Sequence, residues 1–184
     1  MNTLFLQSVL FATMLSAGLT FEPKKIKAPS NEKDGVATPA SKLPQSYVYK
    51  KNGNQVDVSR ISNNGKPFAI VLWATWCEPS YVELDKIAKQ YSKWKKETGF
   101  KIFAISLDNL DKGGVDIIDF VKSKDWKFEI YCDSKKECAN SFGFNGPPLT
   151  ILCDGDGTVQ YKKEGYADGS EQILWDQLKS ITKQ

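Results

Sequence analysis

The sequence has 184 residues, of which 41% are hydrophobic and 26% charged, a balance typical of a soluble globular chain of about one domain. The formal net charge is only +3 and Arg60 is the one arginine, so the arginine-bearing basic stripe of a nucleic-acid-binding protein is absent. Histidine is also absent, which excludes Ser–His and Cys–His catalysis and Cys/His zinc sites. No Cys-x-x-Cys pair occurs, and we expect neither a metal nor a cofactor.

The first 42 residues differ in composition from the rest of the chain. Residues 4–21 carry no charged side chain and include a run of small residues, a pattern typical of a signal peptide, although no lysine or arginine precedes it. The same stretch reaches the lower end of the ~17–25 residues that a membrane-spanning helix needs, so an uncleaved anchor is the alternative. Residues 22–42 are too polar to fold alone. We therefore expect residues 1–21 to be a signal peptide or membrane anchor, residues 22–42 a flexible tether, and residues 43–184 the folded domain.

From residue 43 the hydrophobic pattern predicts strands that alternate with helices. Residues 47–49 and 56–58 flank an Asn-Gly turn and predict a hairpin, and 68–73 is the continuous apolar run of a strand buried on both faces. An amphipathic helix follows, with apolar residues at helical spacing from Val82 to Trp94 and a stop at Gly99. Further strands are expected over 101–107, 128–132, 149–153 and 158–162, and further helices over 115–124, 135–142 and 171–181. This order indicates an α/β domain with a mostly parallel sheet, helices on both faces and a closing hairpin.

One cysteine occupies a special position in this arrangement. Cys77 lies in the loop between the buried strand 68–73 and the next helix, at the sheet edge where ligands and chemistry usually lie. Directly before a helix, unpaired backbone N–H groups and the helix dipole stabilise a thiolate. A buried, inert cysteine is the alternative. The turn residues Trp76 and Pro79 beside it favour the reactive interpretation.

The segment Trp73-Ala74-Thr75-Trp76-Cys77-Glu78-Pro79-Ser80 resembles the active-site segment of the thioredoxin superfamily, and more closely that of exported TlpA/ResA-type thiol-disulfide oxidoreductases. The preceding hairpin and the segments 104–108, 146–150 and 154–157 follow in the family's order, so the resemblance covers residues 43–184. It implies a thioredoxin-like fold with a mixed central sheet, an N-terminal hairpin and an inserted helix-strand unit. It also implies protein thiols or disulfides as substrates, a membrane-bound electron donor, and a location in the periplasm or at the outer face of the cytoplasmic membrane.

The resemblance assigns roles to particular residues. Cys77 corresponds to the attacking cysteine, and Pro148 to a cis-proline that faces the attacking sulfur and helps to present the substrate. Glu83 corresponds to a carboxylate that relays protons near the active-site cysteines; the alternative is a solvated charge on the helix surface. Trp76 and Pro79 are expected to contact the substrate. Trp73 is expected to restrict access to the sulfur with Trp76.

Two positions depart from the family pattern. Ser80 stands where the family has its second, resolving cysteine, and because a hydroxyl cannot attack a mixed disulfide, ordinary dithiol reduction through residues 77 and 80 is excluded. This serine is either natural or an engineered trap, and we expect it to hydrogen-bond the Cys77 sulfur. Pro147 precedes Pro148 and has no N–H to offer an extended substrate, so docking should be weaker and use the carbonyl alone.

These features leave two main functions open. The preferred one is an exported, isomerase-like thiol-disulfide oxidoreductase that acts through the single cysteine Cys77. The alternative is a redox-inactive thioredoxin-fold module that holds a client protein. A peroxidase is disfavoured because relatives of that kind need a threonine where this chain has Ala74 and an arginine nearby, whereas Arg60 lies well upstream.

The other cysteines lie far from Cys77 in the sequence. Cys132 ends a predicted strand and Cys138 follows six positions later, beyond a reversal of the chain, which favours a local disulfide over two free thiols. A less favoured hypothesis is that this pair resolves the mixed disulfide of Cys77. Cys153 lies within an apolar strand and is expected to be a core residue.

Overall fold

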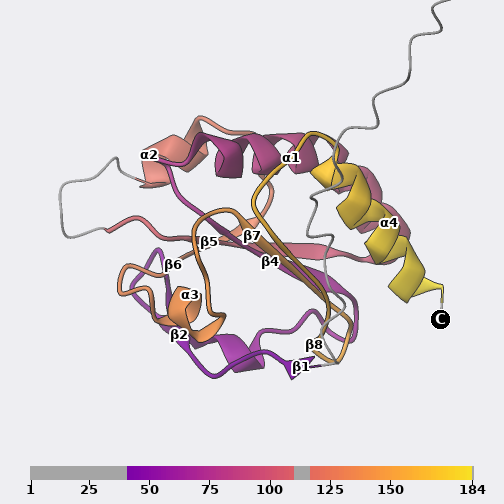
Figure 1. The fold of residues 1–184 in the computed structure, drawn as a ribbon, viewed down its shortest axis with the longest axis horizontal. Helices are drawn as coiled ribbons and strands as arrows, with labels where there is room; N and C mark the ends of the chain where they lie inside the picture. Colours follow the sequence, from indigo (N-terminus) through magenta and orange to yellow (C-terminus); the bar gives the residue numbers. More distant parts are fainter. Residues whose placement is uncertain (1–40, 110–116, 184) are drawn as a thin grey trace, which may run out of the picture. The chain divides into compact units, whose positions relative to one another are not determined.

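The computed structural model describes residues 41–109 and 117–183, all of which lie in one compact unit (Figure 1). The predicted signal peptide or anchor, and all but the last two residues of the predicted tether, lie outside the described residues. Those last two, Ser41 and Lys42, form strand β1 and pair with the C-terminal hairpin, so the sheet begins just before the predicted start of the domain. Within the described residues, no helix is both long and apolar enough to cross a membrane.

In the described part of the chain, eight strands form one sheet in the order β1-β8-β7-β4-β5-β6-β2-β3. Their bounds are β1 (Ser41–Lys42), β2 (Tyr47–Lys50), β3 (Gln55–Asp57), β4 (Phe68–Trp73), β5 (Lys101–Ser106), β6 (Glu129–Cys132), β7 (Leu149–Cys153) and β8 (Thr158–Glu164). The expectation of a mostly parallel sheet is wrong, because among these described strands only the β4·β5 and β5·β6 pairings are parallel. Hydrophobic patterns locate strands but do not fix the direction of their pairing. The mixed sheet implied by the resemblance is confirmed.

Four α-helices cover the two faces of this sheet within the described residues. They are α1 (Glu78–Thr98), α2 (Ile117–Lys122), α3 (Glu137–Ser141) and α4 (Ser170–Thr182). Helices α1, α2 and α4 contribute to one apolar cluster, and α3 contributes to a second cluster together with the 3-10 turn Val58–Arg60 (Figure 1). The thioredoxin-like layering of helix, sheet and helix is therefore present, with α2 and β6 as the inserted unit.

Helix α1 forms as its sequence predicts. Leu84, Ile87, Tyr91 and Trp94 recur at helical spacing, and all four are buried against the sheet. The helix ends at Gly99, whose φ of 71° is left-handed and whose N–H donates to the Lys95 carbonyl. Two helix tryptophans pack in the core: Trp94 stacks on Trp175 of α4 with ring centroids 5.3 Å apart. Because α1 follows β4 after only four residues, its start lies at the carboxyl end of β4.

Candidate functional site

Cys77 is the half-buried N-cap residue of α1, directly beyond the carboxyl end of β4. No side chain caps this helix end, and Pro79 occupies its first turn, where the missing N–H costs nothing. The Cys77 thiol instead donates to the Pro147 carbonyl, with Sγ 3.2 Å from the oxygen. The helix end therefore presents its unpaired N–H groups and positive dipole beside a thiol that solvent can reach.

The segment that faces the sulfur is the turn before β7. The peptide bond between Pro147 and Pro148 is cis, and the Pro148 carbonyl accepts a hydrogen bond of 2.8 Å from the N–H of Gly165 beyond β8. Pro148 is buried and Pro147 is half-buried. The resemblance placed this turn opposite Cys77, and the 3.2 Å contact between Sγ and the Pro147 carbonyl puts it there.

Ser80 supports the loop between β4 and α1. Its side chain is buried, and its hydroxyl lies 2.6 Å from the Cys77 carbonyl and 3.1 Å from the Ala74 carbonyl. It also accepts a 3.2 Å hydrogen bond from the Ala74 N–H. The expected hydrogen bond from Ser80 to the sulfur is not among these contacts, because the nearby backbone carbonyls already use its single proton.

Glu83 is a buried acid, only 1% exposed, and the alternative of a solvated surface charge is wrong. One carboxylate oxygen accepts a 3.1 Å hydrogen bond from the Thr150 hydroxyl, and the other is buried without a partner among the described residues. Burial raises the pKa of Glu83 to about 7, although the Thr150 hydrogen bond and the positive charge of Lys163 oppose the rise and the negative charge of Glu171 adds to it. The carboxyl can therefore hold or release a proton near neutral pH.

One short segment joins Glu83 to the site of Cys77. The Pro147 carbonyl contacts the sulfur, and Thr150, three residues further on at the start of β7, donates to Glu83. Residues 147–150 therefore contact Cys77 at one end and Glu83 at the other, and link the thiol to the buried acid.

The two tryptophans near Cys77 lie in different environments. Trp76 is 63% exposed and offers an apolar surface to an approaching polypeptide, and Pro79 is exposed as well. Trp73 is fully buried and packs edge-on against Trp126, with ring centroids 5.0 Å apart. The expectation that Trp73 restricts access to the sulfur is therefore wrong, since the last residue of a central strand here points into the core.

Asp108 is a part of the site that the sequence analysis missed. Its carboxylate is buried just beyond β5 and accepts hydrogen bonds from the Thr75 N–H at 3.0 Å and the Thr75 hydroxyl at 2.7 Å. Ser106 donates to it at 2.5 Å. It therefore ties the loop that carries Cys77 to the neighbouring strand. An acidic residue directly after the buried run 101–107, at the same sheet edge, was the available signal.

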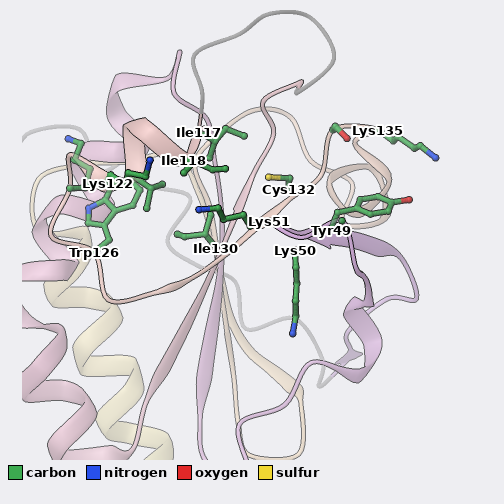
Figure 2. Close-up of a pocket in the computed structure, with 14 residues that line it drawn as sticks. Tyr49, Lys50, Lys51, Ile117, Ile118, Lys122, Trp126, Ile130, Cys132 and Lys135 are labelled. Atoms are coloured by element: carbon green, nitrogen blue, oxygen red, sulfur yellow. The ribbon is translucent and has the colours of Figure 1, made fainter.

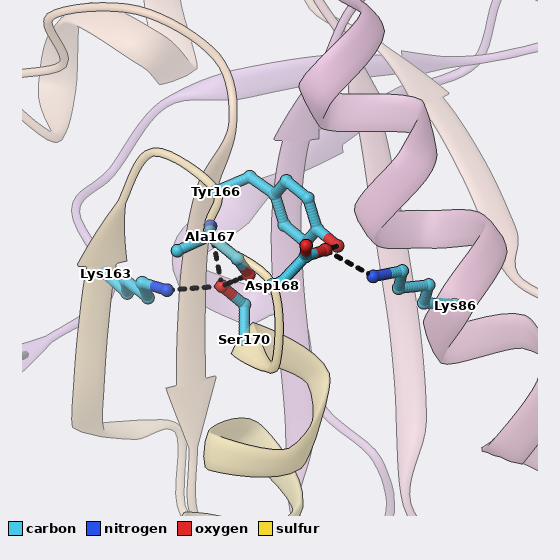
Figure 3. A network of polar contacts seen from close by, with 6 residues as sticks. All are labelled: Lys86, Lys163, Tyr166, Ala167, Asp168 and Ser170. Carbon is cyan, nitrogen blue, oxygen red and sulfur yellow. Dashed lines mark hydrogen bonds and ion pairs between the residues drawn. The ribbon is translucent and has the colours of Figure 1, made fainter. Parts of the chain in front are cut away.

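The loop between β8 and α4 is also tied to this region (Figure 3). Lys86 of α1 forms a 2.7 Å ion pair with Asp168, and Tyr166 donates to the same carboxylate at 3.1 Å. Lys163 donates to the Ser170 hydroxyl, which in turn is bonded to the backbone of Ala167 (Figure 3). These contacts hold in place the lysine whose charge acts on Glu83.

The disulfide predicted between Cys132 and Cys138 is not present, because all four cysteines are free. The two thiols lie in different apolar clusters, Cys132 with α1 and α2, and Cys138 with α3. Burial raises the pKa of Cys132 to about 11 and that of Cys138 to about 12. Strand β5 separates β6, which carries Cys132, from β4, so the structure does not bring this thiol to Cys77. Cys153 is buried in the core as expected.

Among the described residues, no cluster of three or more Cys, Asp or Glu side chains could hold a metal ion.

The chain is similar to several curated proteins and solved structures. Among curated proteins, the chain is 28% identical to the thiol:disulfide interchange protein DsbE of Haemophilus influenzae over 178 residues, which cover 95% of this chain and 88% of that protein. It is 27% identical to the thiol-disulfide oxidoreductase ResA of Bacillus subtilis over 119 residues, which cover 65% of this chain and 63% of ResA. The chain thus spans less than two thirds of the length of ResA.

Among solved structures, an uncharacterized thioredoxin-like protein from Porphyromonas gingivalis matches with a TM-score of 0.69 and 27% identity, over 79% of this chain and 95% of that one. A putative thiol:disulfide interchange protein DsbE from Chlorobium tepidum matches with a TM-score of 0.66 and 25% identity, over 79% and 98% of the two chains. The thioredoxin-like fold is thereby confirmed. A family model described as "AhpC/TSA family" matches residues 35–162, more than half of the sequence. The chain therefore belongs to the AhpC/TSA family, among relatives named as thiol-disulfide oxidoreductases.

Proposed function

We propose that this protein is an exported thiol-disulfide exchange protein that acts on protein disulfides through Cys77 alone. The observation that carries the proposal is the position of Cys77: of the four cysteines only this one is not buried, and it lies at the start of α1 with its sulfur 3.2 Å from the Pro147 carbonyl. The names of the relatives support the reaction class. The uncharged segment 4–21 supports export to the periplasm or the outer face of the cytoplasmic membrane.

The first step is an exchange of one disulfide for another. The Cys77 thiolate attacks one sulfur of the substrate disulfide, the substrate S–S bond breaks, and a bond forms between Cys77 Sγ and the attacked sulfur. The second substrate sulfur leaves as a thiolate and takes up one proton. We assign this proton to Glu83, because Thr150, three residues beyond Pro147, holds its buried carboxyl, and because its pKa of about 7 lets it carry a proton at neutral pH.

The second step depends on a thiol from outside the chain, because Ser80 offers no second sulfur. When the released substrate thiol, or another thiol of the same substrate, attacks the mixed disulfide, Cys77 is restored and the substrate disulfide is either reformed or moved. When a low-molecular-weight thiol attacks Cys77 Sγ, the substrate leaves as a dithiol. A second such thiol then restores Cys77 and becomes the oxidised disulfide. In the cell, a membrane-bound electron donor would supply these two electrons.

The substrate chain docks on the surface around the sulfur. Trp76 supplies an exposed apolar contact, Pro79 lies beside it, and the Pro147–Pro148 turn faces the sulfur. The Pro147 carbonyl accepts the thiol proton only while Cys77 is protonated, so it becomes free for a substrate N–H once the thiolate forms. Pro147 has no N–H of its own to pair with the substrate.

The test is turnover of a peptide that contains one disulfide, with glutathione in excess and the full chain as catalyst. We expect the Cys77→Ala variant to lose all turnover above the uncatalysed rate. Cys153→Val, which replaces a buried thiol by a side chain of similar size, should retain it. Equal rates with and without Cys77 would contradict the proposal.

A redox-inactive module that holds a client is the second candidate, favoured by the exposed Trp76 and by the absence of a second sulfur at position 80. It predicts that an unfolded, cysteine-free polypeptide binds the full chain, that Cys77→Ala leaves this binding unchanged, and that Trp76→Ala weakens it. The two candidate functions therefore predict different sensitive variants: Cys77→Ala for disulfide exchange and Trp76→Ala for client binding.

A further inference from the structure

A cavity of about 680 Å³ opens between α2, β6 and the tip of the β2–β3 hairpin, outside the site of Cys77 (Figure 2). Its size falls within the ~300–1,000 Å³ of pockets that bind small molecules. Ile118 and Val121 of α2 line it, together with Trp126 and Ile130. Because these side chains are largely apolar, they give the cavity an apolar floor that an apolar ligand could cover.

The mouth of the cavity is cationic. Five of its described lining residues are lysines and none of them is acidic, the lysines being Lys50, Lys51, Lys122, Lys124 and Lys135. Lys122 is neutralised by Asp119 at 2.6 Å and Lys124 by Asp85 at 2.7 Å. Within the part of the chain that the structure describes, no salt bridge involves Lys50, Lys51 or Lys135. Asp119 also acts electrostatically on Lys51, and Glu129 on Lys50. The five lysines still outnumber these two carboxylates and Asp85, so the mouth keeps an excess of positive charge.

Lys51 is the lysine whose side chain points toward the apolar floor. In Figure 2 its side chain points from the hairpin tip toward Ile130, whereas the side chains of Lys50 and Lys135 point outward. A lysine ammonium is a point charge on a flexible stem, which suits an anionic head group without demanding a fixed geometry. An anion above Ile130 would thus meet Lys51 directly and the other lysines at longer range.

The floor distinguishes between an acyl chain and a peptide. A peptide laid across it would bring backbone N–H and C=O groups that need hydrogen-bond partners, and each buried group without one is costly. Besides the lysines, the described lining side chains offer the hydroxyls of Tyr49 and Ser134 and the thiol of Cys132, since the Trp126 indole N–H already donates to Asp85. An alkyl chain needs no such partners and gains from every buried methylene.

From the apolar floor, the excess of lysines over carboxylates at the mouth and the scarcity of polar partners, we infer that this cavity binds a single-chain fatty carboxylate. The alkyl chain lies on Ile118, Val121, Trp126 and Ile130, and the carboxylate lies at the mouth beside Lys51. The inference is independent of the thiol chemistry, since no residue of the Cys77 site lines the cavity.

The experiment is titration calorimetry of the full chain with decanoate below its micelle concentration. We expect one saturable site, and weaker binding of decyltrimethylammonium, which has the same chain length and the opposite charge. Lys51→Glu should weaken decanoate binding by at least ~fivefold, the size expected when a surface attraction becomes a repulsion. Lys89→Glu, an exposed lysine of α1 that does not line the cavity, is the matched control and should leave binding unchanged.

A second pair of variants tests the location. Ile130→Trp fills the floor and should abolish binding, and Val121→Phe at a half-buried position serves the same purpose if Ile130→Trp fails to fold by circular dichroism. Decanoate binding that survives the filling, or equal binding of the cationic amphiphile, overturns the inference. So does the absence of any decanoate binding, or binding of an acidic peptide in its place. Cys77-dependent turnover in the same variants reports separately on the proposed function.

Discussion

Replacing Glu83 by Gln should make the protein more stable at neutral and alkaline pH but not in acid. The folded chain holds this carboxyl with only one hydrogen bond, from Thr150, and leaves its second oxygen buried without a partner among the described residues. Burial therefore disfavours the charged form. The amide of Gln keeps the shape of the protonated acid but cannot ionise, so the substitution removes the charge and little else.

The magnitude follows from the pKa of Glu83, which burial raises from the ordinary 4.5 to about 7. Below pH 4.5 both the folded and the unfolded chain hold the proton, and the group contributes no pH dependence. Between about 4.5 and 7 only the folded chain keeps it, so unfolding releases a proton and the stability falls as the pH rises. At 1.36 kcal/mol for each pH unit, the loss levels off above pH 7 at about 3 kcal/mol.

The assay is urea unfolding under reducing conditions at intervals from pH 4 to pH 8.5, for the wild type and for Glu83→Gln. The difference between their free energies of unfolding should grow by about 3 kcal/mol across this range. Glu97→Gln, at an exposed position of the same helix, is the matched control and should give a constant difference. Parallel curves for the wild type and Glu83→Gln would refute the idea that burial keeps this acid protonated.

Three further predictions concern the thiol site. At pH 7 in the native state, iodoacetamide should label Cys77 alone, because burial raises the pKa of the other three thiols to about 11 or 12. Peptide mass spectrometry measures the labelling of each cysteine. Labelling of a buried thiol in the native protein would contradict the prediction, the buried thiols being Cys132, Cys138 and Cys153. Ser80→Cys should restore a resolving thiol and allow reduction of insulin by the dithiol form, at a stability cost of about 1 kcal/mol for the lost hydroxyl contacts. If the thiol introduced by Ser80→Cys stays free and forms no disulfide with Cys77, the loop holds the two positions apart. Pro147→Val should speed exchange with an extended peptide disulfide by about two- to tenfold, the worth of one hydrogen bond, and an unchanged rate would remove the docking role of this position.

The sequence located the site better than it described it. The buried run 68–73 and the stop at Gly99 are strong signals, so the loop that carries Cys77 falls where it was expected. The burial of Glu83 was also available, because residues 83, 87, 91 and 94 lie on one face of an α-helix, and that face is buried. A family role for this acid and its helical position therefore lead to the same conclusion.

The wrong prediction of a disulfide between Cys132 and Cys138 shows that local sequence patterns do not reveal which face of the sheet a helix covers. Residues 131 and 132 point to opposite faces of β6, as in any strand, but the sequence does not say which face α3 covers. Since α3 packs on the face of Tyr131, its Cys138 lies across the sheet from Cys132. The mistaken expectation of a mostly parallel sheet has a similar cause. The direction in which β7 pairs with β4 depends on the path of the connecting chain, which hydrophobic periodicity does not record.

The side chains that hold the loop around Cys77 in place are different from the group that contacts its sulfur. Ser80 holds the Ala74 and Cys77 backbone, and Asp108 holds Thr75, through groups that do not change when the sulfur is oxidised. In a two-cysteine site, oxidation would add a covalent bond across this loop. Here the hydrogen bond of 3.2 Å from the sulfur to the Pro147 carbonyl depends on the state of the sulfur. A mixed disulfide at Cys77 would therefore alter the docking turn and leave the loop that presents the sulfur as it is.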